Sequence, residues 1–229
     1  MAGGKKMEYN IVMTYLHKKR ILIATTNPAK IKTMKRILDK LGYEALSFAD
    51  LGISLDEPAE TKLTAEEIAA EKALGYAKQY SDLPVLARDD TNTLIGVSEE
   101  DDPKNHNKEF VARRKGEYTD ANGEAVFSEI AHKYGGEIPV RFDWGYALAW
   151  HDGEDIKVVS TIASNDIEKA KLVDEISDVK FPGFCFSSVV KIKTKDGWKF
   201  DSELSEEETW EAYWNRQRDA IDYLLKQMI

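Results

Sequence analysis

A short apolar run that stops at an Asn-Pro pair constrains the fold of this chain more than any other feature. Residues 21–26 read Ile-Leu-Ile-Ala-Thr-Thr and predict a buried strand, which Asn27-Pro28 ends. Pro28 suits the first turn of a helix, and apolar residues then recur at helical spacing as far as Gly42. A strand that passes directly into a helix is typical of an α/β fold.

Four further segments are predicted before residue 140. A second helix is expected over residues 64–80, with Thr64 as N-cap, Glu67 completing a capping box, and an inner side of Ile68, Ala69, Ala73 and Ala77. Residues 84–87 predict another buried strand. The acidic, polar residues 98–107 predict a surface loop or an insertion, and residues 127–134 predict a helix.

The later part of the chain is rich in aromatic and β-branched residues. Residues 140–150 and 156–162 predict a hairpin that turns at Asp152-Gly153, and residues 184–192 predict another strand. Residues 206–228 predict a closing helix. Strands mixed with helices favour an α/β fold with an elongated mixed sheet and flanking helices.

The composition narrows the classes of function. The chain has 229 residues, 42% hydrophobic and 32% charged, which suits one sizeable α/β domain or two lobes around a cleft. Its net charge of −9 argues against a general nucleic-acid binder, which needs a basic face. The single cysteine, Cys185, excludes an internal disulfide, and no apolar run is long enough for a membrane span, so a cytoplasmic location is expected. The four histidines, His17, His106, His132 and His151, are interpreted as surface or structural residues.

The segment Thr25-Thr26-Asn27-Pro28-Ala29-Lys30 is the most informative for chemistry. A strand that turns into a helix points backbone N–H groups and the positive end of the helix dipole at whatever lies above it, and phosphate is the natural guest. Asn27 can donate a hydrogen bond and Lys30 can supply a point charge. The glycines and the Gly-Lys-Ser/Thr ending of a Walker loop are absent. Taken alone, the segment also fits an ordinary helix cap followed by a surface lysine.

Acidic residues gather in two further segments. Residues 60–73 place Glu67 and Glu71 four positions apart on one helix face, where carboxylates repel unless they are solvated or share a cation. Arg88-Asp89-Asp90-Thr91 is expected at the carboxyl end of a strand, where α/β sheets bind ligands. A hard, oxygen-liganded ion such as Mg²⁺ fits these side chains. The alternative is a solvated helix face and a simple turn.

Three ordered blocks resemble the inosine triphosphate pyrophosphatase family. Residues 25–30, 60–73 and 86–91 are similar to its Ser/Thr-Gly-Asn-Pro-Gly-Lys, Glu-Thr-Gly-x-Thr-Phe-x-Glu-Asn-Ala-x-x-Lys-Ala and Leu-Ala-Asp-Asp-Ser-Gly blocks. The likeness covers roughly the first 95 residues well, and residues 135–162 fit the central hairpin of the family only by pattern. It implies a two-lobed, Mg²⁺-dependent, usually homodimeric enzyme that removes non-canonical purine nucleotides. Residues 20–229 are then one domain, and residues 1–19 an extension that is either partly a cloning remnant or an extended start.

The resemblance also implies roles for individual residues. Thr25, Thr26, Asn27, Lys30 and Thr91 would bind substrate, and Glu67 would ligate Mg²⁺ together with Asp90. Asp90 would activate water, but an extra residue around Arg88 leaves a second register in which Asp89 takes that role. In either register a carboxylate takes a proton from the attacking water, while the metal and Lys30 stabilise the departing pyrophosphate.

The C-terminal half departs from the family pattern. Residues 181–189 resemble the block Gly-Phe-Gly-Tyr-Asp-Pro-x-Phe, with Phe184 kept but Ser187 where Asp is expected. The Ser-His-Arg triplet with which the family typically reads a purine is missing. Residues 210–218 contain Trp214, Arg216 and Arg218 instead. Trp214 could stack on a base, although an aromatic residue on a terminal helix also suits a core.

Three hypotheses follow from these patterns. The first is an active nucleoside triphosphate pyrophosphatase with an altered choice of base. The second is a nucleotide-binding protein of the same fold with weak catalysis, and the third is an unrelated α/β phosphohydrolase. The aromatic residues 142–150 could supply the apolar patch of a homodimer.

Overall fold

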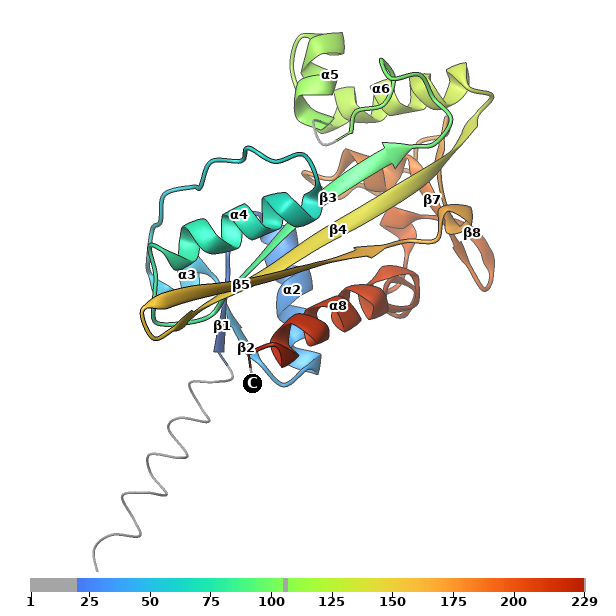
Figure 1. Ribbon diagram of the computed structural model, residues 1–229. Coiled ribbons are helices and arrows are strands. Elements are labelled where there is room, and N and C mark those ends of the chain that lie inside the picture. Colours follow the sequence, from blue (N-terminus) through green and yellow to red (C-terminus); the bar gives the residue numbers. More distant parts are fainter. Residues whose placement is uncertain (1–19, 105–106, 229) are drawn as a thin grey trace, which may run out of the picture. The chain divides into compact units, whose positions relative to one another are not determined.

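The computed structural model describes residues 20–104 and 107–228 (Figure 1). These residues divide into two compact units. The first unit takes in residues 20–89, 144–162 and 217–228. The second takes in residues 90–104, 107–143 and 163–216. Residues 1–19, and with them the predicted extension and His17, lie outside the described residues, as does His106.

The first unit is built on a parallel arrangement of strands. Strand β1 (Arg20–Ile23) pairs in parallel with β2 (Glu44–Leu46) and with the start of β3 (Val85–Leu94). Its helices are α2 (Pro28–Lys40), α3 (Phe48–Leu51), α4 (Ala65–Ala77) and most of α8 (Asn215–Lys226). One buried cluster joins strand and helix side chains, among them Leu22, Ala69, Ala73 and Val85.

The second unit is built on antiparallel strands. The first residues of β4 (Glu137–Asp152) pair with β6 (Ala170–Val173), which pairs with β7 (Val190–Thr194) and through it with β8 (Gly197–Phe200). Helices α5 (Asn107–Lys115), α6 (Asp120–Lys133) and α7 (Glu206–Thr209) belong here. Three 3₁₀ turns complete the unit: η1 (Ile167–Lys169), η2 (Cys185–Ser188) and η3 (Asp201–Glu203).

Strand pairing confirms the expected α/β class with a mixed sheet and flanking helices. The strands hydrogen-bond in the order β2-β1-β3-β4-β6-β7-β8, and β5 (Asp155–Ser164) pairs with β4. The hairpin predicted at Asp152-Gly153 is present as β4 and β5, with Gly153 at a φ of 66° in its turn. A positive φ there explains why a glycine occupies the turn.

The structure corrects four predictions of secondary structure. Strand β3 continues to Leu94, so Asp89 and Asp90 lie within a strand and not after its end. Residues 184–192 are not one strand, because residues 185–188 form η2 before β7 begins. The closing helix is interrupted by a π-helical turn, η4 (Trp210–Trp214). The loop predicted at residues 98–107 is not all superficial, because Asp101 is 2% exposed.

Candidate functional site

The turn between β1 and α2 is closed by its own side chains. Asn27 is the N-cap, and its Oδ1 accepts hydrogen bonds from the backbone N–H groups of Ala29 (3.0 Å) and Lys30 (3.3 Å). The N–H of Asn27 donates to Oγ1 of Thr25 at 3.2 Å, and Thr26 is exposed. The N–H groups predicted to face a phosphate therefore already have acceptors, and the side-chain amide of Asn27 keeps donors for a ligand.

Asp89 connects the three segments that the sequence singled out. Nζ of Lys72, on α4, lies 2.9 Å from Oδ1 of Asp89 and 2.8 Å from Oε1 of Glu60. Nζ of Lys30, on α2, lies 3.7 Å from the same oxygen of Asp89. The side chains of Lys30, Lys72 and Asp89 are 17%, 14% and 13% exposed, so the group is shielded but still open to water. The geometry places one carboxylate between two ammonium groups.

The environment of Lys72 favours its charged form. Burial alone lowers the pKa of Lys72, but attraction to Asp89 and hydrogen bonds to Glu60 and Asp89 raise it above its ordinary value. Lys72 therefore remains a cation at neutral pH. Neither Lys72 nor Glu60 was predicted to be a site residue, although both belong to the matched block of residues 60–73.

Asp90 is the next residue along β3. Successive side chains of a strand point to opposite faces of the sheet, and Asp89 and Asp90 are neighbours within β3. Arg88 likewise points to the other face from Asp89, and its guanidinium lies 5.9 Å from the ring centre of Tyr146. The structure thus brings Asp89 to the lysines.

Each carboxylate at the start of α4 has a partner of its own. Glu67 accepts a hydrogen bond from the hydroxyl of Thr64 at 2.8 Å, and Thr64 caps the helix by accepting from the N–H of Glu67. Glu71 binds the hydroxyl and, at 2.8 Å, the N–H of Thr61, and these hydrogen bonds lower the pKa of Glu71. Glu67 and Glu71 are therefore each held by a threonine and do not need to share a cation.

A divalent metal fits the donor chemistry of this region. In residues 20–104 and 107–228 no three acidic, histidine or cysteine side chains converge as a ready-made metal site. Mg²⁺ commonly uses one or two carboxylates, with water and substrate phosphates as its remaining ligands. Exposed Glu67 and half-buried Asp89 are oxygen donors of that kind, so the residues fit an ion that arrives with its substrate.

The residues predicted to contact the base are mostly engaged inside the second unit. Ser187 is 4% exposed, and its hydroxyl donates to the backbone oxygen of Phe184 at 2.8 Å. Arg216 donates to Oδ2 of Asp166 at 2.6 Å and to the backbone oxygen of Ser164 at 3.2 Å. These contacts make Ser187 and Arg216 structural in this conformation.

The other predicted contacts are more accessible. Phe184 and Thr91 are half-buried. Trp214, in η4, packs edge-on against Trp210 with ring centres 5.1 Å apart, and it is also half-buried. Arg218 pairs with Asp219 at 2.8 Å. Trp214 is therefore the predicted aromatic contact that keeps both a packing partner and an accessible surface.

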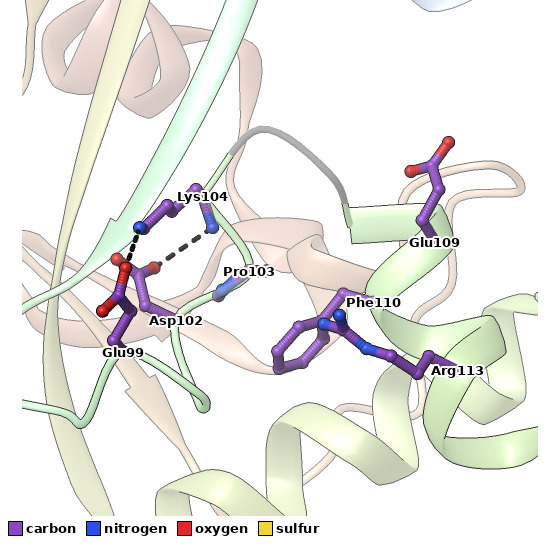
Figure 2. A pocket seen from close by; sticks show the side chains of 7 residues that line it. All are labelled: Glu99, Asp102, Pro103, Lys104, Glu109, Phe110 and Arg113. Atoms are coloured by element: carbon purple, nitrogen blue, oxygen red, sulfur yellow. Dashed lines mark hydrogen bonds and ion pairs between the residues drawn. The ribbon is translucent and has the colours of Figure 1, made fainter. Parts of the chain in front are cut away.

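The second unit also contains a hollow of about 390 Å³ that no sequence pattern predicted (Figure 2). Its walls carry both charges, because Glu99, Asp102 and Glu109 lie around Lys104 and Arg113. Phe110 forms an aromatic part of the wall, with the Arg113 guanidinium 5.8 Å from its ring centre. None of these residues was predicted to contact substrate, and the mixed charge does not favour a phosphate.

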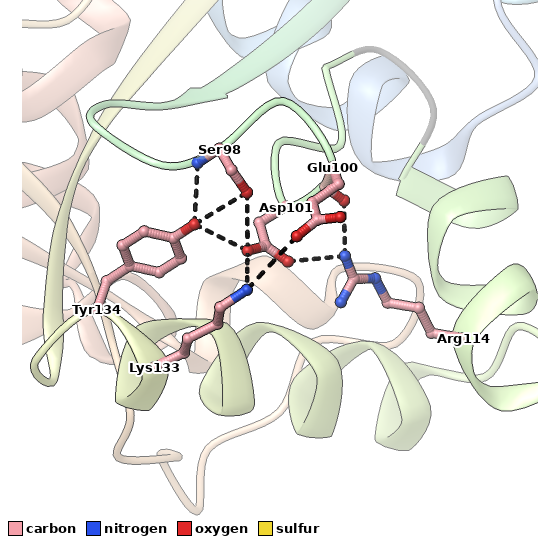
Figure 3. A network of polar contacts seen from close by, with 6 residues as sticks. All are labelled: Ser98, Glu100, Asp101, Arg114, Lys133 and Tyr134. Atoms are coloured by element: carbon pink, nitrogen blue, oxygen red, sulfur yellow. Dashed lines mark hydrogen bonds and ion pairs between the residues drawn. The ribbon is translucent and has the colours of Figure 1, made fainter.

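A polar network beside this hollow centres on Asp101 (Figure 3). The carboxylate receives hydrogen bonds from Lys133 (2.7 Å), Tyr134 (2.8 Å), Arg114 (2.9 Å) and Ser98 (3.1 Å). Burial alone raises the pKa of Asp101, but these donors lower it well below its usual range. The network fastens the 98–104 loop to α5 and α6, which is a structural role.

Among the described histidines, His132 pairs with Asp174 and the ring of His151 contacts the backbone oxygen of Ala77, as expected of structural residues.

The aromatic patch proposed for dimerisation is not exposed. Trp144, Tyr146 and Leu148 are 6%, 0% and 0% exposed within the chain itself. In the part that the structure describes, no helix is long and apolar enough to cross a bilayer.

This chain is similar to proteins of a known family. The model of the Ham1 family matches residues 21–171. The dITP/XTP pyrophosphatase of Bacillus subtilis is 31% identical over 210 residues, which cover 91% of this chain and 96% of that protein. The dITP/XTP pyrophosphatase of Haemophilus influenzae is 37% identical over 117 residues, 50% of this chain and 55% of that protein.

Solved structures show the same fold. The Staphylococcus aureus Ham1 protein superposes with a TM-score of 0.61 at 21% identity, covering 92% of this chain and 98% of that one. A HAM1 protein from Coxiella burnetii gives 0.60 at 18% identity, covering 91% and 98%.

Proposed function

The chain belongs to the Ham1 family, and from this premise we propose that it hydrolyses nucleoside triphosphates to the monophosphate and pyrophosphate. The full-length likeness to a dITP/XTP pyrophosphatase supports non-canonical purine nucleotides as substrates. The structural likenesses, at 21% and 18% identity, support the fold alone.

One observation carries the proposal. Asp89 lies 2.9 Å from Nζ of Lys72 and 3.7 Å from Nζ of Lys30, so an acid stands beside the lysine at the predicted phosphate turn. A hydrolysis of this kind needs a proton acceptor for the attacking water next to cations that bind phosphate. We therefore propose Asp89 as the proton acceptor, with Asp90 as the alternative.

Other residues of the first unit supply binding. The Asn27 side chain and the Lys30 ammonium group bind the phosphates. Lys72 pairs with both Asp89 and Glu60 and thereby fixes the position of Asp89. When bound, Mg²⁺ supplies charge neutralisation for the triphosphate, with Glu67 as the protein ligand that we propose.

The range of substrates is proposed to be broader than a strict preference for ITP and XTP. Arg216 is committed to Asp166 and Ser187 to Phe184, so two of the groups expected to read the base are occupied. A base is selected strongly only where the site leaves polar groups unpaired with the wrong base. The same observations favour a second candidate, a nucleotide-binding protein with weak catalysis.

We also propose a homodimer in the cytoplasm. The usual assembly in the family supports the dimer, but buried Trp144 and Leu148 cannot supply its surface. A single, buried cysteine, Cys185, suits a reducing compartment. Light scattering at micromolar concentration tests the assembly, and a monomer would remove this part of the proposal.

The test of the activity is the product. Purified protein with Mg²⁺ is incubated with ITP, XTP, dUTP, ATP and GTP, and phosphate is measured with and without added inorganic pyrophosphatase. Phosphate that appears only with the coupling enzyme identifies pyrophosphate as the product. Phosphate without it indicates a phosphatase, and no phosphate despite nucleotide binding supports the second candidate.

A further inference from the structure

We infer that Gly145 is a positioning residue for the catalytic group. Because Gly145 has no side chain, strand β4 packs directly against the first turn of α4. The inference rests on the proposed function, since it concerns where α4 places its carboxylates and Lys72. Both elements belong to the first unit at this point of the chain.

The contact at Gly145 is closer than any side chain allows. A Cβ atom built on Gly145 would lie 2.1 Å from the carbonyl carbon of Ala65, 2.2 Å from its oxygen and 2.3 Å from the backbone nitrogen of Glu66. All three atoms belong to backbone, which cannot rotate aside as a side chain can. Ala65 and Gly145 are both buried, so solvent does not provide room either. Even a methyl group would force the helix and the strand apart by more than an ångström.

The neighbouring strand holds the same helix turn from a second side. The hydroxyl of Ser160, on β5, donates to Oε1 of Glu66 at 2.9 Å. The β4–β5 hairpin therefore contacts the start of α4 through a bare backbone at Gly145 and through a hydrogen bond at Ser160. These two contacts from one hairpin fix the position of the first turn of α4.

The start of α4 carries or leads to the groups that the reaction needs. Thr64 and Glu67 form its cap, and Lys72 follows within the same helix and contacts Asp89 and Glu60. A helix moves as a rigid body over this length, so a displacement at Ala65 is transmitted to Lys72. A misplacement of about 1 Å in a catalytic group can lower the rate by about 10²-fold.

The experiment compares two glycines of the same hairpin. Gly145→Ala inserts a methyl group against α4, whereas Gly153→Ala strains the turn at a φ of 66° with nothing within 4 Å of the new Cβ. Both variants are expected to lower the melting temperature. Only Gly145→Ala is expected to lower kcat, by about 10²-fold, and to raise the Mg²⁺ concentration for half-maximal rate, with the KM for ITP nearly unchanged.

A readout without turnover accompanies the kinetics. Binding of Mn²⁺ is followed by electron paramagnetic resonance in the presence of a non-hydrolysable α,β-imido triphosphate, and Gly145→Ala is expected to weaken it severalfold while Gly153→Ala does not. Ser160→Ala removes one hydroxyl from the hairpin side and is expected to act in the same direction by roughly threefold. It carries the test if Gly145→Ala does not fold.

The outcomes separate this inference from the proposed function. A wild-type protein that releases no pyrophosphate contradicts the function, whatever the variants do. An active wild type whose Gly145→Ala and Ser160→Ala variants match Gly153→Ala in kcat and Mn²⁺ binding overturns the inference alone.

Discussion

The turn predicted to bind phosphate and the segment predicted to read the base use their charged residues in different ways. In the first unit, Lys30 and Lys72 converge on Asp89 from two different helices, and the side chains remain partly open to water. In the second unit, Arg216 pairs with Asp166 and Trp214 packs on Trp210. In the first arrangement, charged side chains lie close together where a ligand could contact them. In the second, the side chains contact other parts of the same unit. The part of the chain proposed to bind phosphate therefore keeps its charged side chains partly open to water, whereas in the part predicted to read the base they contact the rest of the fold.

The largest expected effect would come from Asp89. Asp89→Asn removes the proposed proton acceptor between the lysines and is expected to lower kcat by about 10³-fold, whereas Asp90→Asn is expected to lower kcat by less than about tenfold. Steady-state rates of pyrophosphate release measure both. The reverse order would restore the register in which Asp90 is catalytic, and two active variants would end the assignment.

Glu67 is expected to rank next. Glu67→Gln keeps the shape of the side chain but weakens a proposed Mg²⁺ ligand, so kcat should fall by about 10²-fold and recover in part at high Mg²⁺. Glu71→Gln, on the same helix, is the matched control, because Glu71 holds Thr61 and is not assigned to the metal. Equal Mg²⁺ titration curves for the two variants would contradict the role of Glu67.

The base-reading part should give smaller and more uneven effects. Arg216→Ala is expected to change kcat/KM by less than about threefold, equally for ITP, XTP, ATP and GTP, because an exposed ion pair supports the fold only weakly. Trp214→Ala should alter the ratios among these bases, because a half-buried ring has some exposed surface on which a base can stack. A preference for ITP or XTP above about a hundredfold, unchanged in both variants and in Arg218→Ala, would show that the base is read elsewhere.

The smallest effect concerns pH and an internal pair of the second unit. Burial raises the pKa of Asp201 to about 6, although the hydroxyl of Tyr213 hydrogen-bonds to it and acts in the other direction. The contribution of Asp201 to the free energy of unfolding is therefore fully present below its ordinary pKa of 3.8. It is lost as the pH rises through about 6.

Asp201→Asn keeps a hydrogen-bond acceptor for Tyr213 but cannot ionise. Relative to wild type, its melting temperature is expected to rise by a few degrees between pH 4 and neutral pH. Melting curves of both proteins measure this difference, and a difference that does not change with pH would contradict the prediction.

Local patterns predicted the elements that depend on neighbouring residues. The β1 turn, its Asn27 cap and the 152–153 hairpin all follow from residues within a few positions of one another. The predicted strand over residues 184–192 failed because η2 is held by contacts far along the chain, such as the hydrogen bond from Ser188 to Glu124 at 2.6 Å. Periodicity cannot register a partner that lies 64 residues away.

The same limit applies to the site. Lys30 and Asp89 were selected from the sequence, but their meeting depends on the parallel pairing of β1 with β3. Arg216 was selected for its charge, and only the structure reveals that Asp166 occupies it. Gly145 gave no signal, because its role follows from the approach of another backbone.

The Asn27 cap makes phosphate binding at α2 an exchange of acceptors. A phosphate that takes the N–H groups of Ala29 and Lys30 must displace an oxygen that already accepts both of them. The exchange is favoured only because a phosphate carries negative charge and the amide oxygen of Asn27 is neutral. A triphosphate carries more negative charge than a monophosphate. We therefore expect the Asn27 side chain to accept these two hydrogen bonds again when the monophosphate leaves, so that the cap assists product release. Amide hydrogen exchange at residues 29 and 30, alike in the free and monophosphate-bound protein but different with a triphosphate analogue, is the expected signature.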